Sequence, residues 1–404
     1  MKKQVLIATG LAVLSTSAHA TKARMDALGQ DADQGSLYIL DSRSVFRNAA
    51  HVNTFKNYVV TEWGTAGNGA DNAGAPEAEG GFFRETGAFS YGVYLANEQD
   101  ADNNMRTAGN NGYASQQTSI TGASVTMGDS NFQAEDNAID LFFGGDMGIQ
   151  WGARVHYASS ATEPSGVNFE RSQSSLGLGL GMTMGDLEAY TNLELMDESE
   201  GATASGDKWE ADTGIQVGAS YRMGDLTFFA DYDMEGAEYT SGGATNETEQ
   251  TTIQVGVGKT HEISSTSRLY MDIMYYNMSA EDTPASGTKV ESDFNNIPVT
   301  FGYETDATDW LALRGSVSQS LPFLNEQEDT FGSTTAKADD LANTSVTAGA
   351  TLNFGKLKVD GMIGTTSTDR DAGAPNTTAV NRDTNEGILT LDNAMTRVAV
   401  HYWF

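Results

Sequence analysis

The sequence predicts an all-β protein: a transmembrane antiparallel β-barrel of 14–16 strands with a short, partly helical plug segment at its N-terminus. Three observations predict it. Segments in which apolar and polar residues alternate recur along the chain and turn at short glycine-containing sequences. Beyond the first twenty residues, no apolar run reaches the roughly 18 residues that a spanning helix needs. The chain also ends on an alternating strand with an aromatic face. A membrane would therefore be crossed by strands.

The first twenty residues have the three parts of a secretory signal. Lys2 and Lys3 form a positive start, residues 5–14 are apolar, and Ala18-His19-Ala20 is a cleavage site with small residues at both ends. We expect cleavage after Ala20, a plug or periplasmic segment over residues 21–56, and a barrel over residues 57–404. The sequence has no cysteine, so neither a disulfide framework nor a cysteine-linked lipid anchor is expected.

Composition narrows the classes of function. The chain has 55 acidic and 23 basic residues and a net charge of −32, which argues against nucleic acid as a partner, because phosphate neutralisation dominates that binding. With 44 glycines and 6 prolines, the composition suits many strands joined by polar loops. Composition alone also allows a secreted β-sandwich or β-helix.

Hairpins define the predicted wall. Three share one pattern and turn at Met-Gly-Asp or Phe-Gly-Lys: residues 176–195, 215–234 and 346–364. Three more have other short turns: residues 139–157, 253–275 and 297–317. Polar stretches such as 197–207 and 324–340 are expected to be loops on the opposite end. Further strands are expected at 58–63, 83–95 and 120–127, and with the last strand they bring the total to 14–16.

The alternation also predicts which side chains face the lumen. One face is apolar, as in Val217, Phe228 and Tyr232, and should meet lipid. The other face carries charges of both signs, and a barrel of this size is wide enough to hold water. The predicted lumen residues are Arg154, His156, Glu188, Glu194, Glu210, Asp212, Arg222, Asp231, Arg314 and Arg397. They favour an aqueous passage; the alternative is scattered salt bridges that stiffen the wall.

The last eight residues, Arg397–Phe404, alternate Val398, Val400, Tyr402 and Phe404 with a more polar set. This strand resembles the closing strand of bacterial outer-membrane β-barrels. The resemblance implies that Tyr402 and Phe404 are read by the barrel insertion machinery, and that the chain resides in the outer membrane with its lipids and lipopolysaccharide as neighbours. Whether the barrel forms a homo-oligomer is left open.

The N-terminal segment has a second resemblance. The apolar spacing from Ser44 to Phe55 predicts a helix. Ala27-Leu28-Gly29, followed by residues 44–52 (SVFRNAAHV), is similar to the N-terminal hatch of the long-chain fatty-acid transporter family, whose motif is Ala-x-Gly and later Asn-Pro-Ala-x-Leu. Asn48-Ala49-Ala50 lacks the proline of that motif. This resemblance implies an apolar path, whereas the inward faces are charged. The main interpretation is thus a porin-like channel for small hydrophilic solutes. The alternatives are a channel for hydrophobic compounds and a surface adhesin or structural barrel.

Catalysis is not expected. Four histidines follow the signal, at positions 51, 156, 261 and 401, and none has the neighbours that known barrel proteases or phospholipases need. Acidic stretches at 97–104 and 233–249 lack the spacing of a calcium loop, so we expect no metal and no cofactor.

Overall fold

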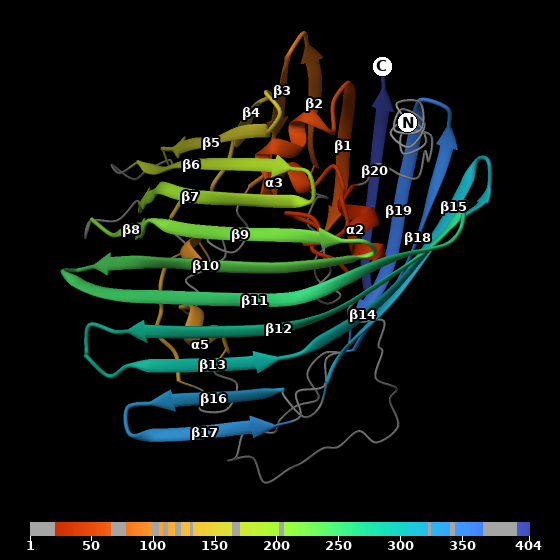
Figure 1. Cartoon of the computed structure of the whole chain (residues 1–404). Coiled ribbons are helices and arrows are strands. Elements are labelled where there is room, and N and C mark those ends of the chain that lie inside the picture. Colours follow the sequence, from red (N-terminus) through yellow and green to blue (C-terminus); the bar gives the residue numbers. More distant parts are fainter. Residues whose placement is uncertain are drawn as a thin grey trace.

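The computed structural model describes residues 21–65, 78–98, 105–107, 112–117, 123–129, 132–163, 170–201, 206–321, 325–339, 344–366 and 394–404. Twenty strand segments form one antiparallel sheet that closes on itself (Figure 1). Four barrel strands are each interrupted once, as the pairs β8/β9, β13/β14, β15/β16 and β17/β18, so the wall has 16 strands. The predicted fold class is confirmed at the upper end of its range.

The strands follow one another around the wall in sequence order. The first part of the chain gives β1 (Tyr58–Thr65), β2 (Ala78–Thr86), β3 (Phe89–Leu95), β4 (Ile139–Asp146), β5 (Gln150–Thr162), β6 (Arg171–Met184), β7 (Leu187–Glu200), β8 (Lys208–Ala211), β9 (Gly214–Met223) and β10 (Leu226–Ser241). The rest gives β11 (Ala244–Ser264), β12 (Ser267–Thr283), β13 (Val290–Asn296), β14 (Pro298–Thr308), β15 (Leu311–Ser320), β16 (Glu326–Phe331), β17 (Thr334–Asp339), β18 (Thr344–Phe354), β19 (Leu357–Thr366) and β20 (Ala394–Trp403). Closure comes from β1, which pairs with both β2 and β20, with Tyr58 opposite Trp403.

The two ends of the barrel differ. Two-residue turns such as Gly185-Asp186 and Gly224-Asp225 lie at the same end as Phe404, and the glycines there adopt positive φ angles. Long connections lie at the other end, and there β11 extends to 21 residues. In outer-membrane barrels the short turns face the periplasm, so the end with the long connections is the outer one.

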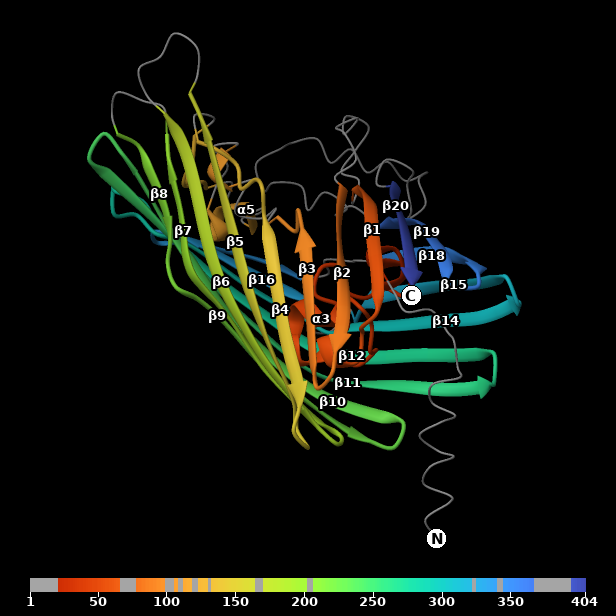
Figure 2. The same ribbon diagram turned by 90° about the horizontal axis from the view of Figure 1, so that it is seen from above.

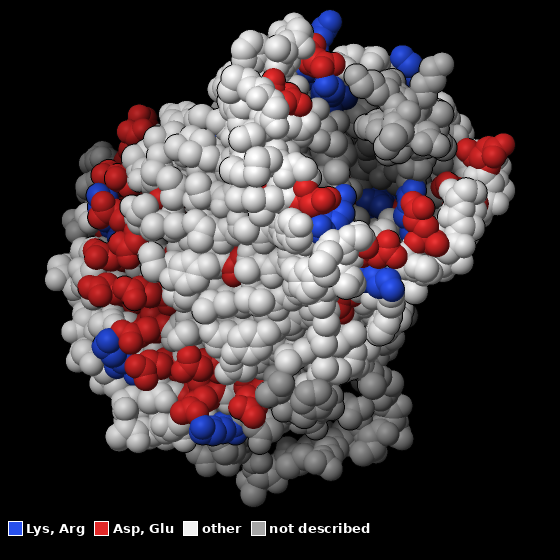
Figure 3. All heavy atoms as spheres, viewed as in Figure 1, with Lys and Arg blue, Asp and Glu red and all other residues white. Residues whose placement is uncertain are grey.

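The outward face is apolar, as the alternation predicts. Val217, Phe228 and Tyr402 are 42%, 44% and 42% exposed, whereas Ala399 and His401, which point inward from the last strand, are 0% and 1% exposed. Figure 3 shows that this face is nearly free of charge, while acidic residues gather toward the outer ends of the strands. Among the described residues, no helix is long and apolar enough to cross a membrane. The protein is a barrel of the outer membrane, and we expect its apolar face to meet lipid.

Two segments fill the lumen (Figures 1 and 2). The plug, residues 21–56, contains α2 (Lys22–Ala27), α3 (Ser44–Arg47) and the 3₁₀ helix η1 (Ala49–Asn53), and lies in the periplasmic half. The inner loop is the described part of the connection between β3 and β4, residues 96–98, 105–107, 112–117, 123–129 and 132–138. It contains α5 (Tyr113–Gln117) and lies in the outer half against β11, β12 and β13. The predicted helical spacing of the plug holds in part: Val45, Phe46, Ala49, Val52 and Phe55 are all buried, but Asn48 is extended and separates two short helices.

Three predicted segments are corrected. Residues 83–95 are not one strand but a hairpin, because Gly87 at positive φ turns the chain between β2 and β3. Of the predicted strand at 120–127, the described residues 123–127 add no strand to the wall and lie inside, with Met127 fully buried. Residues 324–340, expected to be a loop, contain the β16–β17 hairpin, which extends the wall outward. The predicted signal, residues 1–20, lies outside the described residues.

Candidate functional site

A row of glycines on the inner wall positions the plug. Gly144, Gly152 and Gly181 are direct cross-strand partners on β4, β5 and β6 and all face inward. A Cβ at Gly152 would collide with the carbonyl group of Ala49, and one at Gly144 with the side chain of Val52. The absence of side chains therefore lets η1 approach the wall at backbone distance. We call these three residues the glycine seat.

Ion pairs fix the other side of the plug to the wall. Arg24 of α2 donates two hydrogen bonds to Glu304 of β14, at 2.9 and 2.8 Å, and one to Asp41 of the plug at 2.9 Å. Arg314 of β15 bridges Glu304 and Asp360 at 3.2 and 3.3 Å. These groups are almost completely buried, so removing one partner would leave an uncompensated charge. Burial raises the pKa of the Asp41 carboxyl to about 6 in spite of Arg24 beside it.

A second set of charges lies near the closure of the barrel. Arg43 of the plug contacts Glu79 at 2.9 Å and Glu62 at 3.8 Å, and its guanidinium lies 4.0 Å from the centre of the Phe46 ring. Lys22 binds Glu79 and Asp33, both at 2.9 Å. Carboxylate acceptors and an aromatic face together satisfy a guanidinium that is removed from water. The plug is thus held on its strands by both charge and packing.

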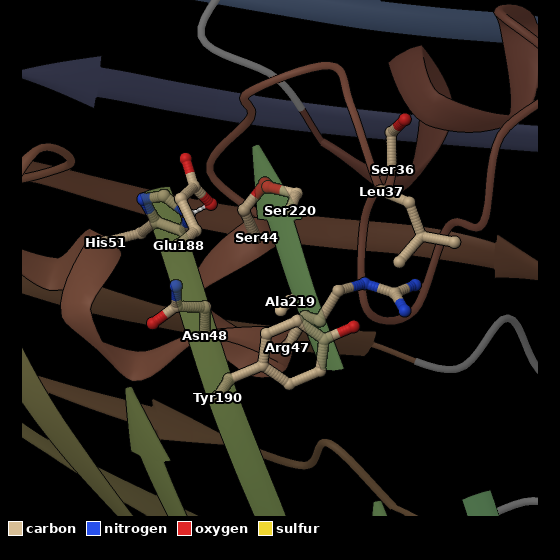
Figure 4. A pocket seen from close by; sticks show the side chains of 10 residues that line it. All are labelled: Ser36, Leu37, Ser44, Arg47, Asn48, His51, Glu188, Tyr190, Ala219 and Ser220. Carbon is tan, nitrogen blue, oxygen red and sulfur yellow. Dashed lines mark hydrogen bonds and ion pairs between the residues drawn. The ribbon is translucent and has the colours of Figure 1, made fainter. Parts of the chain in front are cut away.

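A small pocket lies between the plug and strands β7 and β9 (Figure 4). His51 approaches Glu188 of β7 at 3.0 Å, and Tyr190 of β7 contacts Asp231 of β10 at 2.5 Å. Polar atoms from both the plug and the wall line this pocket, which has room for about one water molecule. The lining residues are Ser36, Leu37, Ser44, Arg47, Asn48, His51, Glu188, Tyr190, Ala219 and Ser220.

The outer half of the lumen contains an apolar cluster. Met105, Tyr113, Val125, Met127 and Phe132 of the inner loop pack against wall residues from four strands. These wall residues are Trp209, Ala237, Tyr239, Ala280 and Val290. Methionine and aromatic side chains form surfaces that adapt to irregular partners. An apolar inner surface is therefore present, although the strand sequences alone show charged inward faces.

Two polar contacts anchor the inner loop. Arg106 donates to both carboxylate oxygens of Asp197 on β7 at 2.8 Å, and both side chains are fully buried. Asp282 of β12 accepts the backbone N–H groups of Ala114 and Ser115 at the start of α5, at 3.2 and 2.7 Å. The loop is thus held at two points about the apolar cluster.

Six of the predicted lumen residues meet the partners named here inside the barrel. Arg154 contacts Asp140 at 2.7 Å, and His156 lies between Asp140 and Glu135, at 3.0 and 3.4 Å. Arg397 contacts Asp26 of the plug at 2.5 Å. Glu188, Asp231 and Arg314 make the contacts described above. Glu194 faces inward beside Gly214, and Arg222 is exposed at the periplasmic side of a pocket adjoining that in Figure 4.

The prediction that Glu210 and Asp212 face the lumen is wrong. Glu210 lies opposite Glu198 and Glu238, and its neighbour Trp209, which is fully buried, takes the inward position. The strand is interrupted between β8 and β9, at Asp212-Thr213, and the interruption exchanges the two faces. Both acidic side chains therefore point away from the lumen. Tyr402 and Phe404 are exposed on the lipid side, and their role in assembly stays a prediction.

Neither the inward position of the inner loop nor the glycine seat was predicted from the sequence. The inward glycines were visible in Leu176–Gly181, but their alignment across three strands requires the register. Within the described part of the chain, no group of three or more His, Asp, Glu or Cys side chains is placed to hold a metal ion.

Comparisons with known proteins give fold neighbours. No family model and no curated protein matches the chain. Among solved structures, the Pseudomonas putida toluene transporter TodX matches with 13% identity over 91% of this chain and 95% of its own, at a TM-score of 0.36. A Pseudomonas aeruginosa FadL homologue matches with 11% identity over 94% and 98%, at 0.40. OmpT, an outer membrane protein of Vibrio cholerae, matches with 12% identity over 86% and 96%, at 0.35. At these values the likeness carries no substrate over to this chain.

Proposed function

We propose that this barrel is a plugged, selective uptake channel of the outer membrane for small hydrophobic or amphipathic molecules. This proposal differs from the interpretation that the charged strand faces favour, which is an open porin for hydrophilic solutes. One observation carries the proposal: both halves of the lumen are occupied, and the outer one is occupied by an apolar cluster of aromatic and methionine side chains.

The inward charges support selection rather than free diffusion. In a general porin such charges would face water, whereas here Arg314, Asp360 and Glu304 are buried and bonded to one another. A hydrated solute would have to break buried ion pairs, which is costly. A small apolar solute can instead enter among adaptable side chains and leave its water outside.

The route that we infer begins at the apolar cluster and continues along the seam between plug and wall. The pocket at His51 and Glu188 lies on that seam, on the periplasmic side of the cluster. Its polar lining suits the polar end of an amphipathic molecule, or water that accompanies an apolar one.

Two measurements separate the channel types. In liposome swelling, arabinose should enter slowly, while cells that produce the barrel should take up labelled toluene faster than cells without it. Toluene is a suitable probe because it is small and apolar and carries no charge and no hydrogen-bond donor. Rapid arabinose entry together with unchanged toluene uptake would overturn the proposal.

A matched pair of variants locates the route. Met127→Glu places a charge in the apolar cluster and should reduce toluene uptake several-fold. Met147→Glu makes the same change at a periplasmic turn, where the side chain is 83% exposed, and should leave uptake unchanged. Heat-modifiable migration on gels verifies that both barrels are folded. Equal uptake by the two variants would place the route elsewhere.

A further inference from the structure

The first residue of the expected mature chain is buried inside the barrel. Thr21 has no exposed surface, and its hydroxyl donates a hydrogen bond to Asp360 of β19 at 3.2 Å. The backbone N–H of the next residue, Lys22, donates to Glu62 of β1 at 2.7 Å. Two carboxylates from strands on either side of β20 therefore hold this residue against the wall.

Covalent geometry places the α-nitrogen of Thr21 close to these carboxylates. Consecutive backbone nitrogens are at most about 3.7 Å apart, so this nitrogen lies within roughly 6.5 Å of the Glu62 carboxylate. The threonine hydroxyl is attached one carbon away from the nitrogen-bearing carbon, which sets a similar limit for Asp360. At about 4–6 Å a carboxylate favours a positive charge on its neighbour.

The ion pairs around this position are short of positive charge. Hydrogen bonds and ion pairs connect one network across the plug and the wall, and it contains four permanent cations and six carboxylates. The cations are Lys22, Arg24, Arg43 and Arg314; the carboxylates are Asp33, Asp41, Glu62, Glu79, Glu304 and Asp360. The network is thus two charges short.

Neighbouring cations face Asp360 more than Glu62. His401 lies 3.3 Å from Asp360, and Lys358 faces Asp360 ahead of Asp306. Beside Glu62, Arg43 lies 3.8 Å away and is shared with Glu79, which it contacts at 2.9 Å. A further cation would therefore be stabilised most at Glu62.

We propose that signal cleavage supplies such a cation: hydrolysis of the Ala20–Thr21 bond liberates an α-ammonium group that becomes a structural cation of the seated plug beside Glu62. One water is consumed, the carboxylate leaves with Ala20, and the new amine on Thr21 takes up the proton. Because Thr21 is buried once the plug is seated, a peptidase can reach this bond only before seating. Processing therefore precedes closure of the lumen.

The helix that follows opposes this charge weakly. An ammonium at the N-terminus of a helix is unfavourable, but α2 has six residues and the effect is confined to the first turn. Two carboxylates in a buried setting interact more strongly than this partial charge. The net preference is for the ammonium.

The test compares two forms of the protein refolded from residue 21. One has a free α-amine, released by a protease that cuts directly before Thr21, and the other is N-acetylated. At pH 7 the free form should unfold at a temperature several degrees higher, and its amine should resist acylation until the protein unfolds. The difference should be present below an α-amine pKa of about 8 and should be lost as the pH rises well beyond it.

A second variant makes the test specific to the carboxylate. Glu62→Gln should shrink the difference between free and acetylated forms, whereas Glu210→Gln, on the outer surface, should leave it unchanged. Equal unfolding temperatures of the two forms, or an equal difference in both variants, would overturn the proposal. So would a mass of the membrane-isolated protein that shows residues retained before Thr21.

Discussion

The periplasmic and outer halves of the lumen are closed by different means. In the periplasmic half, the plug lies on the glycine seat and is tied to the wall through Arg24, Arg43 and Arg314. In the outer half, the inner loop packs through methionine and aromatic side chains about Trp209. Buried ion pairs tolerate little displacement, whereas apolar packing tolerates rearrangement. We therefore expect the plug to close the periplasmic half rigidly and the inner loop to close the outer half adaptably.

The largest expected effect is on conductance. Deleting residues 21–56 removes α2, α3 and η1 from the lumen and should raise single-channel conductance in planar bilayers several-fold. Replacing residues 105–135 with a short Gly-Ser linker should raise it less, because the plug remains. If the loop replacement conducts as well as the plug deletion, the two closures are not distinct.

Next in size is displacement of the plug from its seat. Gly152→Val introduces a side chain where the backbone of Ala49 lies, and should unseat η1 and make the plug sensitive to protease. Gly177→Val is the matched control, since the nearest atom to its Cβ, Cβ of His156, lies 3.3 Å away. Equal protease sensitivity of the two variants would show that the seat does not hold the plug.

A smaller effect, a loss of about 3–5 kcal/mol in the free energy of unfolding, is expected when the buried ion pair between the inner loop and the wall is broken. Arg106→Met leaves Asp197 buried without its cation and should loosen the inner loop. The double variant Arg106→Met/Asp197→Leu should recover most of the loss, because no buried charge remains. Unfolding in urea, followed by the fluorescence of Trp209 after the other tryptophans are replaced, measures both. A double variant as unstable as the single one would contradict this account.

The smallest expected effect is the response of the plug to pH. Burial raises the pKa of Asp26 from 3.8 to about 6, although Arg397 lies beside it. A raised carboxyl pKa means that the seated plug binds more protons than the released one, so this group favours seating as the pH falls from 7 toward 4. In Asp26→Asn this part of the pH dependence should disappear from thermal unfolding curves. An unchanged profile would assign it to other groups.

Much of the wall could be predicted from the sequence. The alternation of Val398, Val400, Tyr402 and Phe404 with Ala399 and His401 gives the correct faces, because the side-chain period of a strand is two. The turns at Gly185, Gly224 and Gly355 are also correct, since two-residue hairpins need positive φ angles there. The error at Glu210 arose where an interruption shifts that period by one residue, which no local pattern marks.

The contents of the lumen could not be predicted in the same way. Residues 96–138 alternate poorly and are rich in polar residues, so they resemble an external loop. Their few apolar residues, such as Met105, Val125 and Met127, find partners on strands distant in the chain. Nothing local predicts such a contact.

The sequence by itself determined that this chain is a barrel, where its strands turn, and which face meets lipid. These features follow from spacing along a single strand. The tertiary structure decided what occupies the lumen, because occupancy depends on side chains from different strands lying at one height. Gly144, Gly152 and Gly181 become a seat only when their strands pair in this register, and charges that look like an open aqueous lining become buried ion pairs once the plug lies among them.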